Sequence, residues 1–207
     1  MRPFASFDSI AGYLGAAKKT GVCSVDIILG LDPRKDRKQL FEQVGVQFQE
    51  ASYSDKIKVW ELCEETACLY RKAANYEELL RQFGLWEKRG AFVNELSGGQ
   101  KQRLFIVLAL LPDPKVVFLD ELTTGLDTKA RRSVWKSLDA LKQKGLTIFL
   151  SSHFMDEVEV LCDTIAILKD GNFIFTGTVQ EAIHQSPYDN LEEAYLWFTG
   201  EEETDDE

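Results

Sequence analysis

The residues best suited to chemistry in this sequence are Ser97, Gly98 and Gly99, which stand at the start of an expected helix. Apolar residues recur downstream at helical spacing, and this predicts a helix over residues 98–111. Ser97 and Gln100 have the spacing of a capping box, in which each side chain satisfies a backbone N–H that the first turn leaves free. A glycine inside a helix costs roughly 1 kcal/mol relative to alanine, so the two glycines need a separate reason.

Two explanations for these glycines stay open. Glycine leaves the backbone bare, so an anion, most simply a phosphate, can approach the N–H groups at the positive end of the helix. Alternatively, two segments of the chain cross closely at this point and no ligand is involved. Both explanations require a small residue, and they differ in what lies against it.

A second set of candidates follows "VVFL", an all-apolar segment that predicts a buried strand. Asp120 and Glu121 come directly after this segment. One carboxylate suits Mg²⁺, either directly or through water, and a second can orient or deprotonate an attacking water molecule. The alternative is that the two acidic residues begin a turn and cap the next helix.

His153 and Gln49 also follow predicted strands, "LTIFLSS" and "VGVQF". Taken singly, each is accounted for as a turn residue. In parallel α/β sheets, however, ligands gather beyond the carboxyl ends of the strands. Together with the helix start and the acidic pair, these two residues outline a site for a Mg²⁺-nucleotide.

The elements that must position these residues alternate between strand and helix after residue 96, which predicts a largely parallel sheet with helices on its faces. Residues 51–95 are charged, aromatic and helical in their periodicity, and they indicate a helical lobe inserted into this α/β core. Further elements are expected as follows: strands over 24–29, 44–48, 115–121 and 146–152, helices within 31–43, 128–145 and 154–163, and a hairpin over 164–177 that turns at Asp170-Gly171.

Composition limits the classes of function. The chain has 207 residues and a net charge of -10, from 34 acidic and 24 basic residues, which argues against a nucleic-acid partner. Its four cysteines lack metal-ligand spacing and indicate free thiols in a reducing compartment. No apolar run approaches the roughly 20 residues of a membrane helix, so at a membrane a partner must hold this protein.

The ordered set of motifs resembles the ATP-binding subunit of ABC transporters. "LSGGQ" (96–100) is similar to the family signature, "VVFLDE" (116–121) to the Walker B strand, "TTGLD" (123–127) to the D-loop, and "SSH" (151–153) to the switch-histidine loop. Gln49 matches the Q-loop glutamine. The resemblance covers roughly residues 30–185, and the ending "LEEAYLWFTGEEE" is similar to the tails of drug and antibiotic exporter subunits.

This resemblance implies a P-loop NTPase-like α/β fold. The core would comprise residues 30–50 and 96–190, the helical subdomain 51–95, an atypical N-terminal segment 1–29 and an acidic tail 191–207. It further implies a protein at the cytoplasmic face of a membrane, bound to an integral-membrane permease and paired with a second ABC ATPase subunit, identical or different.

The resemblance also implies roles for single residues, with ATP and Mg²⁺ as cofactors. Asp120 would hold Mg²⁺ through water, Glu121 would be the catalytic base, and His153 would contact the γ-phosphate. Gln49 would sense the metal and water. The residues expected to bind a nucleotide held by the opposite subunit, or to communicate across the dimer, are Ser97, Gly98, Gly99, Gln100 and Asp127.

One motif of the family is missing from the 207 residues. The P-loop, G-x-x-x-x-G-K-[ST], does not occur, and the nearest string is "GYLGAAKK" (12–19). We therefore expect an incomplete N-terminal part of the fold, weak ATP affinity and little hydrolysis by this chain alone. Two alternatives stay open beside a transport ATPase: a non-catalytic partner that supplies its signature motif to a complete ATPase subunit, and an inactive truncated remnant.

Overall fold

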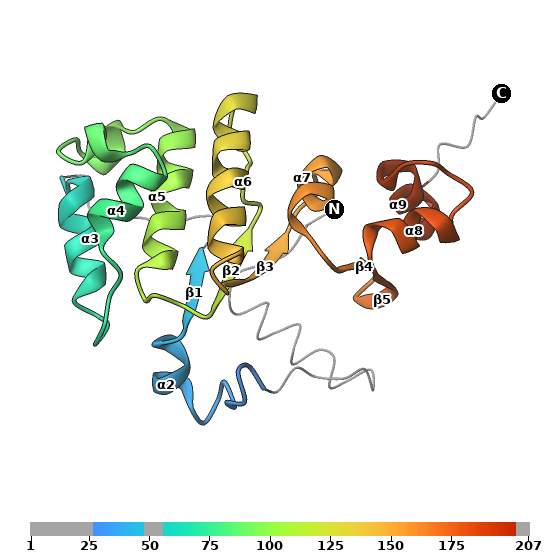
Figure 1. Cartoon of the computed structure of the whole chain (residues 1–207), viewed down its shortest axis with the longest axis horizontal. Coiled ribbons are helices and arrows are strands. Elements are labelled where there is room, and N and C mark those ends of the chain that lie inside the picture. The colour runs from blue at the N-terminus through green and yellow to red at the C-terminus, as the bar shows by residue number, and fades with distance from the viewer. Residues whose placement is uncertain (1–26, 48–55, 202–207) are drawn as a thin grey trace. The chain divides into compact units, whose positions relative to one another are not determined.

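The computed structural model describes residues 27–47 and 56–201, which belong to two compact units with a boundary between Ser151 and Ser152. Figure 1 shows the chain coloured from its N-terminus to its C-terminus. Gln49 and the string at 12–19 lie outside the described residues. We describe the two units separately.

The first unit is built on a parallel sheet. Strands β1 (Val44–Gln47), β2 (Val116–Asp120) and β3 (Thr147–Ser151) lie in the order β1-β2-β3. Both pairings are parallel, so the carboxyl ends of the strands meet at one edge, as the sequence predicts. The central strand β2 is buried, whereas Phe149 on β3 is 57% exposed although its ring lies 5.4 Å from that of Phe118.

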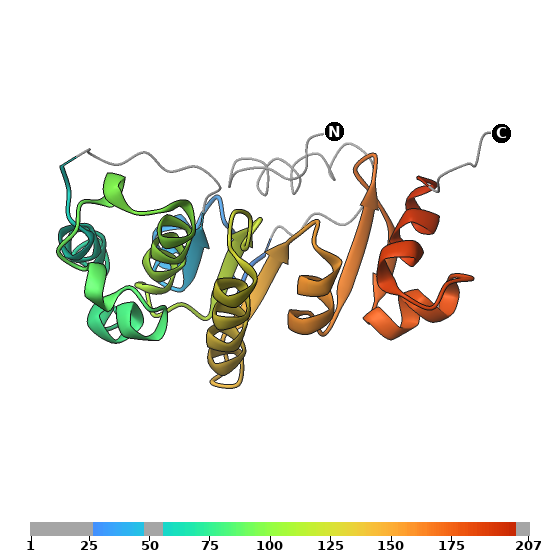
Figure 2. The same ribbon diagram turned by 90° about the horizontal axis from the view of Figure 1, so that it is seen from above.

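Helix α5 (Gly98–Leu110) runs alongside β1 in both ribbon views (Figures 1 and 2). The contact is unusually close because Gly45 of β1 has no side chain. A Cβ atom at this position would lie 1.9 Å from the carbonyl oxygen of Ala109. Helix α5 is therefore held against the sheet, backbone to backbone, close to its C-terminal end.

The other helices of this unit include α2 (Arg37–Phe41) and α6 (Thr128–Lys142). Helix α6 follows β2 and buries Val134 and Leu138, and the chain turns after it at Gly145, whose φ of 99° suits glycine. The expected strand over 24–29 is not formed in its described part. Ile28 makes only an isolated bridge to Leu31 within a turn.

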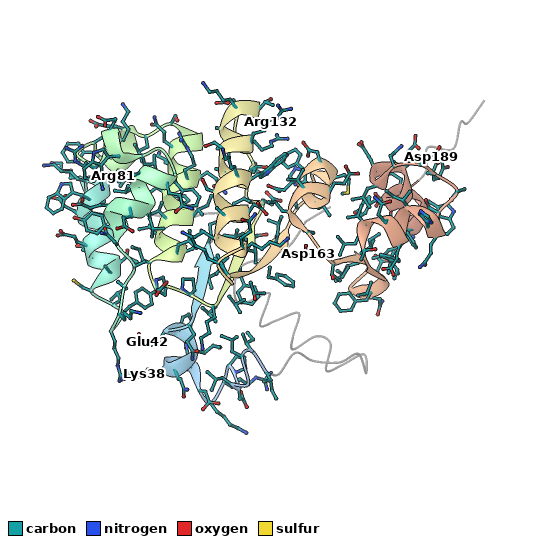
Figure 3. The ribbon with its side chains drawn as sticks, in the orientation of Figure 1. Lys38, Glu42, Arg81, Arg132, Asp163 and Asp189 are labelled. Atoms are coloured by element: carbon teal, nitrogen blue, oxygen red, sulfur yellow. The ribbon has the colours of Figure 1, made fainter. Side chains whose placement is uncertain are left out.

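Residues 56–95 form a helical lobe that packs on α5. It consists of α3 (Val59–Ala67), α4 (Tyr76–Gln82) and two 3₁₀ turns, η1 (Trp86–Lys88) and η2 (Val93–Glu95). Asn75 caps α4 by accepting hydrogen bonds from the amides of the first turn. Figure 3 shows Arg81 on this lobe, and its guanidinium lies 3.6 Å from the centre of the Trp86 ring.

The second unit combines a two-stranded antiparallel sheet with three helices. Strands β4 (Ile165–Lys169) and β5 (Asn172–Gly177) form the expected hairpin, and both turn residues have positive φ, 50° at Asp170 and 79° at Gly171. Helices α7 (Met155–Leu161), α8 (Val179–Gln185) and α9 (Leu191–Thr199) complete the unit. Its core contains Ile165, Ile167, Phe175, Ala182 and Leu191.

The C-terminal segment differs from the sequence prediction, because part of it forms helix α9. The sequence suggests an acidic tail from residue 191, but Leu191–Thr199 is helical and buries Leu191, Ala194 and Thr199. Its two acidic residues, Glu192 and Glu193, lie in the first turn, and Leu191, Tyr195 and Phe198 pack in the core that contains the hairpin residues Ile165, Ile167 and Phe175. Across the described ranges, no helix has both the length and the apolar character needed to cross a bilayer.

Candidate functional site

The N-terminus of α5 has the capping-box geometry that the sequence predicts. The amide of Gln100 donates to Ser97 Oγ at 3.3 Å, and the amide of Ser97 donates to Gln100 Oε1 at 3.0 Å. Within 27–47 and 56–201, the amides of Gly98 and Gly99 donate to no other group. Because these N–H groups lie at the positive end of a 13-residue helix, they can bind an anion.

The two glycines differ in their surroundings. A Cβ atom on Gly98 would have no heavy atom within 4 Å, apart from its own helix backbone and chain neighbours. A Cβ atom on Gly99 would lie 2.9 Å from Cδ2 of Leu126 and 3.7 Å from the carbonyl oxygen of Gly125. The close-crossing explanation therefore holds for Gly99, whereas Gly98 leaves the backbone open, as the anion explanation requires.

Asp120 lies at the carboxyl end of β2 and is 9% exposed. Its amide donates to Oε1 of the buried Gln47 at 3.1 Å, and its Oδ1 accepts a hydrogen bond from the Ser151 hydroxyl. Burial raises the pKa of the Asp120 carboxyl above its usual range; the Ser151 hydrogen bond opposes this and the charge of Glu121 adds to it. The neighbouring strands thus fix both the backbone and the side chain of Asp120.

Glu121 begins the turn after β2 and is also 9% exposed. Its φ is 47°, in the left-handed region that non-glycine residues rarely occupy. The Glu121 amide donates to the carbonyl oxygen of Ser151 at 3.0 Å, which continues the pairing with β3 past the last strand residue. Its positive φ then turns the chain away from the sheet into the segment 122–127.

The donor set fits Mg²⁺ better than a tightly ligated transition metal. No group of three or more His, Cys, Asp and Glu side chains is arranged to hold a metal ion in the part of the chain that the structure describes. Mg²⁺ is usually bound by one or two carboxylates, with water and phosphate oxygens as the remaining ligands. Asp120, with Glu121 beside it, matches that pattern and would hold such an ion.

The remaining predicted site residues lie in different elements of the two units. Asp127 is the N-cap of α6, because its Oδ1 accepts from the Ala130 amide at 2.9 Å. His153 belongs to the second unit, where it is exposed and its ring centre lies 4.1 Å from that of Phe154. Gln100 uses its side-chain oxygen within the capping box. In the first unit, the start of α5 and the segment from Glu121 to Leu126 are brought together.

Three polar residues of this region were not singled out from the sequence. Gln47 and Ser151 contact Asp120, and Gln102 donates to two backbone carbonyls at the Glu121 turn. Gln47 precedes Gln49 by two residues, so strand periodicity could have placed it on the same face. Ser151 is the first residue of the "SSH" string, but the spacing of Gln102 carries no such signal.

A family model described as "ABC transporter" matches residues 20–124, just over half of the chain. The chain belongs to the ABC transporter family. The match includes the segment that carries Ser97, Gly98 and Gly99, and also the acidic pair Asp120 and Glu121.

Two curated relatives from this ABC transporter family illustrate its range. The methionine import ATP-binding protein MetN of Symbiobacterium thermophilum is 44% identical over 126 residues, 60% of this chain and 38% of the relative. The Nod factor export ATP-binding protein I of Rhizobium etli is 44% identical over 107 residues, 52% of this chain and 34% of the relative. This chain thus spans little more than a third of the length of these relatives.

Solved ABC structures have the same fold. An ATP-binding subunit of an ABC transporter matches with a TM-score of 0.74 and 26% identity, covering 89% of this chain and 84% of that one. A dimeric ATP-binding cassette in a post-hydrolysis state with ADP and phosphate matches with a TM-score of 0.63 and 26% identity, covering 73% and 71%. The expected ABC ATPase fold is therefore confirmed.

Proposed function

We propose that this chain is an ATP-binding subunit of an ABC transporter, in which ATP binding and hydrolysis drive transport through a membrane permease. The observation that carries the proposal is the open backbone at Gly98, at the start of a helix whose next turns contact the segment after Asp120 and Glu121. These contacts join the open helix start to the acidic strand end within the first unit, which supports a shared role in binding phosphate and Mg²⁺. The permease would hold the chain peripherally at the cytoplasmic face of the membrane.

Each site residue has its own proposed role in ATP binding and hydrolysis. The Ser97 hydroxyl and the amides of Gly98 and Gly99 bind the terminal phosphate of an ATP molecule held by a second ATPase subunit. Asp120 would hold Mg²⁺, which would supply positive charge beside the phosphates, while Glu121 orients the attacking water and accepts its proton. We assign Gln49 and His153 to sensing the metal and the γ-phosphate in the same way.

The second subunit is part of the proposal because Asp127 and the start of α5 would act across a dimer interface. Support comes from the dimeric state of the ADP-bound relative. The direction of transport that we propose is export, for which the Nod factor export relative and the ending "LEEAYLWFTGEEE" are the support. The methionine import relative, which is also 44% identical, supports the opposite direction, import.

We also propose that this chain binds ATP weakly by itself. Its 207 residues contain no G-x-x-x-x-G-K-[ST] string, whose backbone amides and lysine would supply most contacts to the triphosphate. The open helix start at Gly98 is nevertheless intact. This combination favours a second candidate function, a non-catalytic partner that supplies Ser97, Gly98 and Gly99 to the nucleotide of a complete ATPase subunit.

Titration calorimetry with Mg²⁺-ATP tests these proposals. The Glu121→Gln variant is used to suppress turnover, first alone and then mixed with a complete ABC ATPase subunit. No heat from the chain alone, with Mg²⁺-ATP-dependent association in the mixture, supports the partner role. Micromolar binding by the chain alone would show that "GAAKKT" is a working phosphate loop and would refute weak binding, whereas no response in either sample of folded protein would support an inactive remnant.

A further inference from the structure

Gln102 connects the signature helix to the turn that carries Glu121. From the second turn of α5, its Nε2 donates to the carbonyl oxygen of Leu122 at 3.0 Å and to that of Glu121 at 3.3 Å. Gln102 is half-buried, and the two acceptors are consecutive backbone carbonyls 19 and 20 residues away along the chain. A side-chain amide that bridges two successive carbonyls fixes the orientation of both peptide units.

The turn needs such support because its backbone is strained. Glu121 has a left-handed φ of 47°, a conformation that non-glycine residues rarely occupy and that persists only where the surroundings hold it. The Glu121 carbonyl also accepts a hydrogen bond from the Thr124 amide at 3.3 Å, which closes the turn. The carbonyl that helps to form the turn is therefore the same one that Gln102 holds.

A second contact joins the same two segments. The absent side chain of Gly99 allows α5 to approach Leu126, two residues beyond Thr124. Arg103, one turn further along the same helix, donates from Nε to the Gly99 carbonyl and from Nη1 to the Phe83 carbonyl, which ties the helix start to the helical lobe. The first two turns of α5 and the segment from Glu121 to Leu126 thus form one connected structure.

We propose that Gln102 is a positioning residue that holds the Glu121 turn in its left-handed conformation and couples it to the N-terminus of α5. This inference rests on the proposed function, because the value of orienting Glu121 lies in its role as the catalytic base. A phosphate bound by Gly98 and Gly99 belongs to the opposite subunit, whereas Glu121 acts on this chain's own side of the dimer. Gln102 therefore links the two nucleotide positions of the dimer within one chain.

A matched control variant distinguishes positioning of the Glu121 turn from a purely structural role of Gln102. Gln82 of α4 makes a similar bond elsewhere in the first unit, where its Nε2 donates to the Ser137 carbonyl of α6 at 3.1 Å. Gln102→Met and Gln82→Met each remove one side-chain donor and keep a side chain of similar length. Both are expected to lower the melting temperature by similar amounts, because each loses a helix-to-backbone tether.

The first test measures amide hydrogen exchange by NMR on the full chain without nucleotide. Gln102→Met is expected to speed exchange of the Thr124 amide about three- to tenfold, because the carbonyl that accepts from it is no longer held. Gln82→Met is expected to leave this rate within twofold of the wild type. Equal Thr124 rates in the wild type and in Gln102→Met, or equal acceleration in both variants, would overturn the proposal.

The second test uses Mg²⁺-ATP turnover by the full chain paired with a complete ATPase subunit whose own catalytic glutamate is replaced by glutamine, so that the turnover measured depends on Glu121. Gln102→Met is expected to lower kcat at least tenfold with KM within twofold, since Glu121 is displaced but phosphate contacts remain. An unchanged kcat beside fast Thr124 exchange would refute the link to catalysis. Absence of turnover in the wild-type pair would count against the proposed function, while the nucleotide-free exchange measurement still decides whether Gln102 positions the turn.

Discussion

Replacing Gly98 with alanine is expected to make the protein more stable and less able to bind phosphate. Since nothing lies within 4 Å of the added methyl group, its steric cost is close to zero. Alanine is favoured over glycine in a helix by up to about 1 kcal/mol, and less in the first turn, so we expect a gain in unfolding free energy of about 0.5 kcal/mol. The same methyl group covers the amides that an anion would approach.

Gly99→Ala is the matched comparison. The added methyl group would lie 2.9 Å from Leu126 Cδ2, the end of a flexible side chain, so Leu126 must shift. Moving such a side chain off its rotamer costs about 0.5–1.5 kcal/mol against a helix-propensity gain of about 0.5 kcal/mol, so the unfolding free energy is expected to fall by between about 0 and 1 kcal/mol. The two variants differ by one position along the helix, and we expect Gly98→Ala to be the more stable.

Stability is measured by urea unfolding followed through tryptophan fluorescence. Function is measured as Mg²⁺-ATP-dependent association with a complete ATPase subunit. Loss of one charge-assisted hydrogen bond, worth about 1.5–3 kcal/mol, weakens association by about 10- to 150-fold in Gly98→Ala. If Gly98→Ala lost stability, or if it kept association within twofold of the wild type, the assignment of Gly98 to an open phosphate site would be wrong.

Two further predictions concern packing and thiol chemistry. Gly45→Ala places a methyl group 1.9 Å from the Ala109 carbonyl oxygen, so it is expected to lower the unfolding free energy by about 3 kcal/mol. Gly90→Ala is the control, because its methyl group would have nothing within 4 Å, and its unfolding free energy should stay within about 0.5 kcal/mol of the wild type. Equal urea midpoints for the two variants would refute this prediction. Burial raises the pKa of the fully buried Cys63 thiol to about 12, with a contribution from Glu64, whereas Cys68 is exposed. Iodoacetamide at pH 8, followed by mass spectrometry, should therefore modify Cys68 in the native protein and Cys63 only after unfolding, and native labelling of Cys63 would contradict its burial.

Local chemistry made several elements predictable from the sequence. An all-apolar run of four residues before Asp120 indicated a buried strand, and it is the central strand β2. The Asp170-Gly171 pair indicated a hairpin turn because both residues tolerate positive φ, and both adopt it. Ser97 and Gln100 predicted their own reciprocal hydrogen bonds. In each case the cause lies within a few residues of the effect.

Contacts between distant segments could not be predicted in this way. The close approach of Gly99 to Leu126, the bond from Gln102 to the Glu121 turn, and the bond from Asp120 to Gln47 all join residues at least 19 positions apart. Each depends on how α5 and the strands pack, which periodicity does not specify. For the same reason the sequence predicts a tail where α9 forms, since the partners of its apolar face lie on the hairpin, distant in sequence.

The close contact between Gly45 and Ala109 favours rotation of α5 about its C-terminal end over sliding along the sheet. Ala109 is eleven residues from Gly98, or about 16 Å along the helix axis, and Gln102 is about 10 Å from Ala109. A displacement of about 1 Å at Gly98 therefore corresponds to a tilt of about 4° and moves Gln102 by about 0.6 Å. If the close contact at Gly45 holds the far end in place, a displacement of the helix start reaches the Glu121 turn as a rotation, smaller there by little more than a third.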